Sequence, residues 1–209
     1  MVRLAKFNED NFIDGAIAVA AECGLAAVSM AAIAVRAGAP IGSVYHRFDS
    51  RGAILARAWL RVKGDFRLDV AGRWQGGDTW GAVAALLDWC RRKPVYARFL
   101  LQCEDYPVAE AALAPALHAA LEAEQAALDD CFARCLLALP RRGDGDGDGD
   151  GDGDGDGDGA MLRFILIDGP VAVVKPYLLQ HQPIPASADA ILRASHDAVR
   201  AWATTSRTD

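Results

Sequence analysis

The sequence predicts an all-α protein. Alanine is abundant among its 209 residues and runs of β-branched residues are scarce, and this composition favours helices over strands. Apolar residues recur at the three- and four-residue spacing of amphipathic helices. Capping residues, glycines and prolines divide the chain into about nine segments of helical length. A chain of this size buries a sizeable core.

The first 63 residues carry four predicted helices, each with a recognisable start. Asn8 and Ser29 are good N-caps, and Pro40 has the fixed φ suited to a first helical turn. Gly24 and Gly38 interrupt the pattern where a helix is expected to end. The predicted helices cover residues 7–23, 30–37, 40–48 and 51 to about 62. Short helices joined by turns of a few residues predict a compact bundle.

Residues 64–209 predict a larger, also helical, second domain. A loop is expected at 74–78, and a long helix is expected to kink at Pro115. The predicted helices cover residues 79–92, 94–105, 108–139, 161–180 and 187–204. The last two are apolar on more than one side, which predicts burial against a second subunit.

The acidic charge of the chain is concentrated in one tract. Residues 143–159 alternate glycine and aspartate and contain 8 Asp, so without them the net charge of −6 becomes 22 − (28 − 8) = +2. The first 63 residues hold eight Lys/Arg and five Asp/Glu, which predicts a basic N-terminal domain. The tract itself is predicted to be a disordered linker, with weak calcium binding as the alternative.

Composition also indicates a cellular location. No stretch approaches the roughly 20 unbroken apolar residues of a membrane span, and the N-terminus lacks the apolar core of a signal peptide. Five cysteines without an export signal point to reduced thiols. Together these features predict a cytoplasmic protein that does not bind membranes.

Residues 29–55 contain the most informative pattern. A capped short helix, a glycine turn and a second short helix with polar and aromatic residues precede a basic residue that opens a third helix. These are the parts of a helix-turn-helix motif, whose second helix lies in the major groove of DNA. Each residue also has an ordinary role: Ser29 caps a helix, Tyr45 packs with a wet hydroxyl, and Arg47 and Arg51 are solvated charges. The functional prediction therefore rests on their joint spacing.

Residues 8–62 resemble the N-terminal domain of the TetR (tetracycline-repressor-like, TetR/AcrR-type) family of bacterial transcriptional regulators. The resemblance is carried by the Ser29 cap, by Ala37-Gly38 and above all by the run GSVYHRF at 42–48, followed by Ser50-Arg51 and Leu55. The family pattern there is roughly Gly-Thr-Leu-Tyr-x-His-Phe, then Ser-Lys-Glu and Leu. The resemblance implies that the DNA-binding residues are Ser29, Pro40, Ile41, Gly42, Ser43, Tyr45, His46, Arg47 and Arg51.

The resemblance also implies a role for most of these residues. Ser29, Tyr45 and Arg51 meet phosphates, and Gly42 lets the recognition helix approach DNA closely. The residues expected in or near the major groove are Pro40, Ile41, Ser43 and His46.

Three positions depart from the family pattern. Arg47 stands where the family usually has histidine, and its longer side chain is expected to reach a phosphate or a guanine edge. Ile41 replaces a polar or basic residue and is expected to contact a thymine methyl group. Gly52 replaces an acidic residue and costs the fourth helix up to ~1 kcal/mol relative to alanine.

The resemblance further implies a homodimer that pairs through its last two helices, a roughly palindromic operator in double-stranded DNA, and a small effector in the C-terminal domain. Few charged residues fall inside the apolar stripes, so the effector is expected to be largely apolar. Each candidate pocket residue, taken alone, is better explained as an ordinary core residue. The candidates are Trp80, Trp89, Tyr96, Phe99, Cys103, Tyr106 and Phe132. The predicted function is a repressor that the effector releases from DNA.

Other clusters leave alternatives open. Cys131 and Cys135 lie four residues apart and, with Cys103, suit a thiol sensor, a soft-metal site or small buried hydrophobes. His118 and Glu122 suit a metal site or a surface pair. No catalytic set appears, so neither an enzyme nor a cofactor or metal is expected. The alternative function is a small-molecule or thiol-redox sensor with weakened DNA binding.

Overall fold

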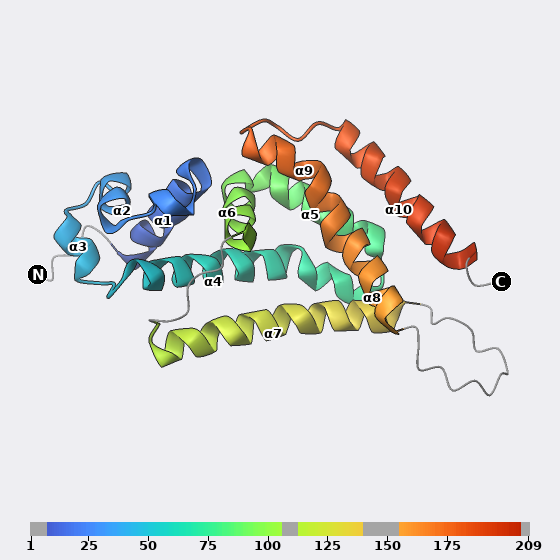
Figure 1. Cartoon of the computed structure of the whole chain (residues 1–209), viewed down its shortest axis with the longest axis horizontal. Coiled ribbons are helices and arrows are strands. Elements are labelled where there is room, and N and C mark those ends of the chain that lie inside the picture. The colour runs from blue at the N-terminus through green and yellow to red at the C-terminus, as the bar shows by residue number, and fades with distance from the viewer. Residues whose placement is uncertain (1–7, 106–112, 140–154, 206–209) are drawn as a thin grey trace, which may run out of the picture. The chain divides into compact units, whose positions relative to one another are not determined.

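The structure, a computed structural model, describes residues 8–105, 113–139 and 155–205, and every regular element in these ranges is a helix (Figure 1). The predicted all-α class is therefore confirmed. The chain forms two packing units, residues 1–66 with 93–126 and residues 67–92 with 127–209. The first unit extends beyond the predicted N-terminal domain of residues 1–63 because α6 (Pro94–Asp105) packs against α1 (Glu9–Cys23).

Helix α1 begins with a reciprocal cap. The Asn8 side chain accepts a hydrogen bond from the backbone N–H of Asn11, and the Asn11 side chain accepts one from the N–H of Asn8, both at 3.0 Å. Phe7, predicted to open this helix, lies outside the described residues. One face of α1 is buried in the first unit and contains Phe12, Ile13, Ala16, Ile17 and Ala20. Gly24 ends the helix with a φ of 85°, which favours glycine.

Two short helices follow, α2 (Met30–Arg36) and α3 (Ile41–Tyr45), and Figure 1 shows α2 beside α1 and α3 beside α2. The Ser29 hydroxyl caps α2 by accepting the N–H of Ala32 at 3.1 Å. Gly38 makes the turn with a left-handed φ of 63°. Helix α3 is shorter than the predicted 40–48, because Pro40 is its extended N-cap rather than its first helical residue.

Helices α4 and α7 both differ from their predicted bounds. Helix α4 (Arg51–Asp69) continues past residue 62, and the Ser50 hydroxyl caps it by accepting the N–H of Ala53 at 3.1 Å. Pro115 begins α7 (Pro115–Ala138) rather than kinking a longer helix. Proline lacks the N–H that a helix interior needs but fits a first turn. The part of the predicted helix over 108–112 lies outside the described residues.

The second unit contains α5 (Thr79–Arg92), α8 (Gly155–Arg163), a π-helical turn over Phe164–Asp168, α9 (Gly169–Leu179) and α10 (Ser187–Thr205). Residues 71–76 form a 3-10 helix where part of a loop was predicted. The core side chains of this unit include Val83, Leu87, Trp89, Leu162, Leu166, Val174, Leu178 and Leu192.

The end of the Gly-Asp tract corrects one prediction. Residues 155–159, predicted to belong to a disordered linker, form the first turns of α8. The following residues pack Leu162 and Leu166 into the core, and a helix anchored by such packing extends more easily than it starts. Residues 143–154 of the tract lie outside the described residues. In the part of the chain that is described, no helix is both long and apolar enough to cross a membrane.

Candidate nucleic-acid interface

Helix α3 has a buried side and an exposed side. Val44 and, just after the helix, Phe48 are 0% and 2% exposed, so they hold α3 against the first unit. Ile41 and Tyr45 are 46% and 59% exposed, and His46 is exposed beside them in the sequence. The exposure of Tyr45 does not fit the alternative in which its ring is a packing residue. Apolar, hydroxyl and imidazole groups therefore remain available on this helix.

Gly42 lies in the first turn of α3 and has open space around it. A Cβ added there would meet no atom of the chain within 4 Å, and its φ is not in the left-handed region. Neither packing nor backbone geometry within the chain requires glycine, although alanine favours a helix by about 1 kcal/mol. The missing side chain is explained if another molecule approaches this turn closely.

The caps that flank α2 and α3 also lie at the surface. Ser29 and Pro40 are exposed and Ser43 is half-buried. The Ser29 hydroxyl is engaged with the Ala32 N–H, which confirms the cap and leaves its phosphate contact a prediction. These three residues and the exposed residues of α3 come from the two helices of the motif.

Arg47 is turned toward the protein. Its Nη1 donates to the carbonyl of Ser43 at 3.2 Å, and its guanidinium carbon lies 5.8 Å from the centroid of the Phe12 ring. The contact with an aromatic face is favourable for a guanidinium group. In this structure Arg47 therefore connects the end of α3 to α1 instead of extending from the exposed side of α3.

Arg51 is likewise engaged inside the first unit. Its Nε donates to the carbonyl of Val28 at 2.6 Å, and its Nη2 donates to the carbonyl of Leu25. These carbonyls belong to the connection between α1 and α2, so Arg51 ties the start of α4 to the start of the motif. Sequence reasoning missed this role because the two partners lie 23 and 26 residues earlier in the chain.

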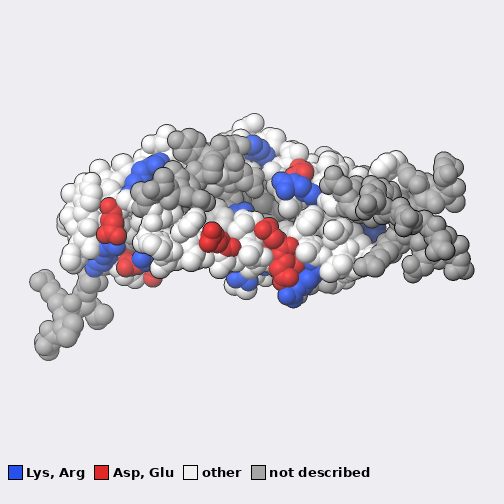
Figure 2. Space-filling model, turned by 60° about the horizontal axis from the view of Figure 1, so that its bottom comes forward, with Lys and Arg blue, Asp and Glu red and all other residues white. Residues whose placement is uncertain are grey.

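Several basic residues of the first unit are paired with carboxylates of α1. Arg36 makes a two-pronged contact with Glu22, and Arg57 donates to Glu9 at 2.6 Å. Arg61 bridges Asp10 and Asp14. Figure 2 shows Lys and Arg side chains next to Asp and Glu side chains on the face in view. These ion pairs neutralise Arg36, Arg57 and Arg61 locally and leave the net charge of the first 63 residues unchanged.

The predicted effector-pocket residues are divided between the two units. Tyr96, Phe99 and Cys103 belong to α6 in the first unit, whereas Trp80, Trp89 and Phe132 belong to the second. Phe99, Cys103 and Trp89 are buried. Tyr96 is half-buried, and desolvation raises the pKa of its hydroxyl. Neither unit therefore contains all six of these residues. Tyr106, the seventh candidate, lies outside the described residues.

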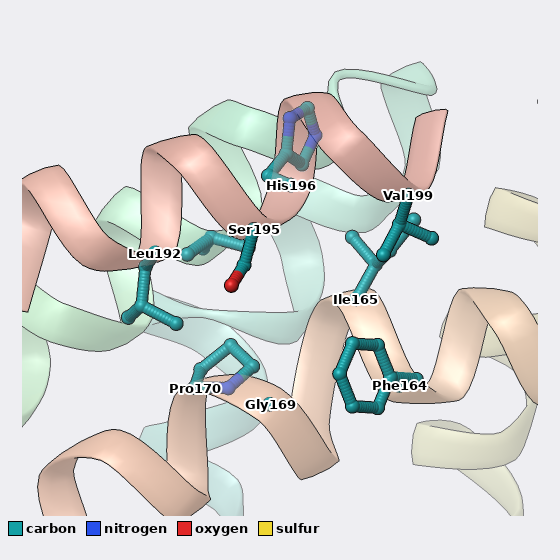
Figure 3. Close-up of a pocket in the computed structure, with 9 residues that line it drawn as sticks. Phe164, Ile165, Gly169, Pro170, Leu192, Ser195, His196 and Val199 are labelled. Carbon is teal, nitrogen blue, oxygen red and sulfur yellow. The ribbon is translucent and has the colours of Figure 1, made fainter. Parts of the chain in front are cut away.

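A small hollow in the second unit is lined by other residues, most of them apolar (Figure 3). It lies among α5, the π-helical turn, the start of α9 and α10. Figure 3 shows Leu192 and Ser195 of α10 facing Pro170, while the ring of His196 is turned away from Pro170. The complete lining is Val83, Phe164, Ile165, Gly169, Pro170, Leu192, Ser195, His196 and Val199. The sequence signal nearest to this hollow is the multi-sided apolar character of residues 161–180 and 187–204, which predicts a dimer interface instead of a pocket.

A buried polar chain borders this hollow and was not predicted. His196 Nε2 and Thr79 Oγ1 are 2.9 Å apart, and both residues are buried. Arg200 donates to Thr79 Oγ1 at 3.4 Å. Because the Asp197 carboxylate only accepts, the neutral His196 ring carries its proton on Nδ1, and Nε2 accepts a hydrogen bond from the Thr79 hydroxyl. His196 Nδ1–H then donates to Asp197 at 3.1 Å, and this bond, followed by the one from Arg193, lowers the pKa of the Asp197 carboxyl. The chain satisfies polar groups between α5 and α10.

The cysteines lie mainly in apolar surroundings. Cys103, Cys131 and Cys135 are buried, which favours the interpretation as small hydrophobic residues. Burial raises the pKa of the Cys90 thiol to about 12 and also raises the pKa of Cys135. Both shifts oppose formation of the reactive thiolate.

The structure offers little support for a metal site. His118 Nε2 lies 3.5 Å from a Glu122 carboxylate oxygen, and both side chains are well exposed, as in the surface-pair alternative. No group of three potential metal ligands occurs among the described residues.

Comparison with known proteins identifies the N-terminal part of the chain. Residues 12–58 match the family model described as "Bacterial regulatory proteins, tetR family". This range contains α1, α2 and α3 and the start of α4. None of the curated proteins compared with the chain matches it.

Solved structures extend the likeness in fold beyond this N-terminal part to most of the chain. A transcriptional regulator from Rhodococcus sp. Rha1 superposes with a TM-score of 0.63 at 17% identity, over 92% of this chain and 96% of that one. A TetR family transcription regulator from Marinobacter aquaeolei VT8 gives 0.61 at 13% identity, over 91% and 94%. The multidrug binding protein EbrR complexed with ethidium gives 0.56 at 16% identity, over 93% and 99%.

The matched model and these structures agree with the sequence resemblance. The family model describes regulatory proteins, in line with the expectation that the chain is not an enzyme. The N-terminal helices of this chain thus match the tetR family of bacterial regulatory proteins over residues 12–58, and its described helices have the fold of TetR family transcription regulators.

Proposed function

We propose that this protein is a sequence-specific DNA-binding transcriptional regulator that reads a roughly palindromic operator through α3. The observation that carries the proposal is the two-sided character of α3, which buries Val44 and exposes Ile41 and Tyr45. Beside them, Gly42 has open space where a side chain would stand. A helix built in this way is anchored on one side and offers base- and phosphate-contacting groups on the other.

The proposed DNA-binding form is a homodimer. Large apolar side chains remain exposed on the last helices of the single chain, and a second copy would cover them. These residues are Phe164, Leu179, Ile191 and Trp202, with exposures of 46%, 46%, 52% and 61%. Two recognition helices then meet successive major grooves, which accounts for the palindrome.

The proposed regulator is a cytoplasmic repressor that a small, largely apolar effector releases from DNA. The similar fold of EbrR, whose structure is described as complexed with ethidium, supports an effector of this chemical class. Release requires that the effector bind the DNA-free state more tightly than the DNA-bound state. The alternative of a thiol-redox sensor is disfavoured by the burial of Cys131 and Cys135 and by the raised pKa of Cys90.

Selection from random duplex DNA with the purified full chain tests the proposal. Enrichment of one palindromic sequence is expected, with binding that weakens as salt rises because phosphate contacts release counterions. Tyr45→Phe removes only the hydroxyl and is expected to weaken binding to all sequences about tenfold per half-site, equivalent to one charge-assisted hydrogen bond in each.

Two further variants complete this test. His46→Ala is expected to change which sequences are preferred. Leu68→Ala removes a side chain that is 70% exposed outside the motif and serves as the control that leaves binding unchanged. The proposal fails if no sequence is enriched over random DNA, or if Tyr45→Phe and Leu68→Ala bind the selected operator equally well.

A further inference from the structure

The geometry points to Ile41 as a specificity-determining residue that recognises the 5-methyl group of a thymine in each operator half-site. This inference rests on the proposed DNA-binding function. Ile41 is the first residue of α3 and is 46% exposed. The N-terminal residues of a recognition helix are the ones that contact base edges.

The backbone around Ile41 admits a base edge. Pro40 on one side and Gly42 on the other are both exposed, and the position of a Gly42 Cβ is open to 4 Å. Neither neighbour therefore keeps the Ile41 side chain away from the floor of the groove. In the major groove the apolar group is the thymine methyl, whereas the other three bases offer polar atoms there. An isoleucine at this position therefore favours thymine, because its side chain makes an apolar contact with the methyl group.

Arginine readout of guanine is the main competing mode of recognition. The three arginines between residues 29 and 51 all have partners inside the chain. Arg36 binds Glu22, Arg47 donates to the Ser43 carbonyl, and Arg51 donates to the Leu25 and Val28 carbonyls. Arg47 is thus a positioning residue that holds the end of α3 beside Phe12. With the arginines engaged, Ile41 contributes to specificity at the first turn of α3 through an apolar contact.

Replacing thymine by deoxyuridine tests the inference without altering the hydrogen-bonding edge of the base. Each thymine of the selected operator is replaced in turn, symmetrically in both half-sites, and affinity is measured by fluorescence anisotropy. For the wild-type protein, replacing thymine at one position is expected to lower the affinity roughly fourfold per half-site, which corresponds to one buried methyl group. At that position Ile41→Ala is expected to bind the thymine and deoxyuridine operators equally well.

Two variants control this experiment. Val35→Ala truncates another exposed apolar side chain of the motif, 82% exposed on α2, and is expected to keep the full sensitivity to deoxyuridine. Ile41→Val retains part of the side chain and is expected to keep part of the sensitivity to deoxyuridine. Circular dichroism confirms that each variant is folded.

Each outcome separates this inference from the proposed function. If the selected operator is bound tightly but tolerates deoxyuridine everywhere, Ile41 does not read a methyl group and the inference is overturned. The same holds if Ile41→Ala retains the wild-type sensitivity. Failure to select any operator overturns the proposed function, and the exposed Ile41 and Tyr45 are then better explained as a protein-docking surface.

Discussion

Replacing Arg51 by methionine removes the guanidinium group and keeps most of the aliphatic stem. The change deletes the donors that reach the Val28 and Leu25 carbonyls. The Leu25 carbonyl still accepts the N–H of Val28 at 3.1 Å, so the greater loss falls on the Val28 carbonyl. The start of α4 then keeps its Ser50 cap but loses its hydrogen bonds to the connection between α1 and α2.

The expected loss of unfolding free energy is about 2 to 3 kcal/mol. A hydrogen bond from a charged donor contributes roughly 1.5–3 kcal/mol, and the second carbonyl here keeps another partner. Arg57→Met is the matched control, because Arg57 pairs with Glu9 at the surface, where the side chains are 45% and 47% exposed. Exposed pairs of this kind contribute about 0–1 kcal/mol.

Urea denaturation followed by circular dichroism measures both variants at one protein concentration, since the proposed dimer would make stability depend on concentration. With a slope of about 2 kcal/mol per molar urea, the midpoint of Arg51→Met is expected to fall by roughly 1 M. The midpoint of Arg51→Lys is expected to lie between those of the wild type and Arg51→Met. One ammonium group does not reproduce the planar guanidinium group, whose two donors reach both carbonyls. A midpoint for Arg51→Met as high as that of Arg57→Met would refute the structural role assigned to Arg51.

Three further predictions concern other parts of the chain. Gly42→Ala is expected to stabilise the protein by up to about 1 kcal/mol and to weaken operator binding, whereas Gly52→Ala stabilises α4 without loss of affinity; equal affinities of the two variants in anisotropy titrations would contradict the close approach at Gly42. Thr79→Val removes the hydroxyl that bonds to His196 and is expected to lower the free energy of unfolding by about 1–3 kcal/mol in thermal or urea denaturation. An unchanged midpoint would show that these hydrogen bonds do not stabilise the fold. Exposed Cys23 is expected to react with iodoacetamide at pH 8 well before Cys90, whose pKa of about 12 keeps it protonated, and equal labelling by mass spectrometry would rule out this ordering.

Local features of the fold were predictable because their partners are close in sequence. The Asn8 and Ser29 caps each involve a backbone N–H three residues away, and the Gly38 turn needs a backbone conformation that favours glycine. The apolar spacing of α1 and α5 likewise reports which face is buried. Helix ends were less predictable: whether Pro40 is a cap or a first residue, and whether Pro115 starts or bends a helix, depends on packing that the pattern does not contain.

The sequence by itself determined the all-α class, the order of the helices in the motif, and the residues at the start of α3. Only the tertiary structure decided where the long side chains point. Arg51 binds carbonyls 23 and 26 residues away, and His196 meets a threonine 117 residues away. The physical reason is that a flexible guanidinium or a buried imidazole takes the partner that folding brings near it, and periodicity along the chain carries no information about that partner.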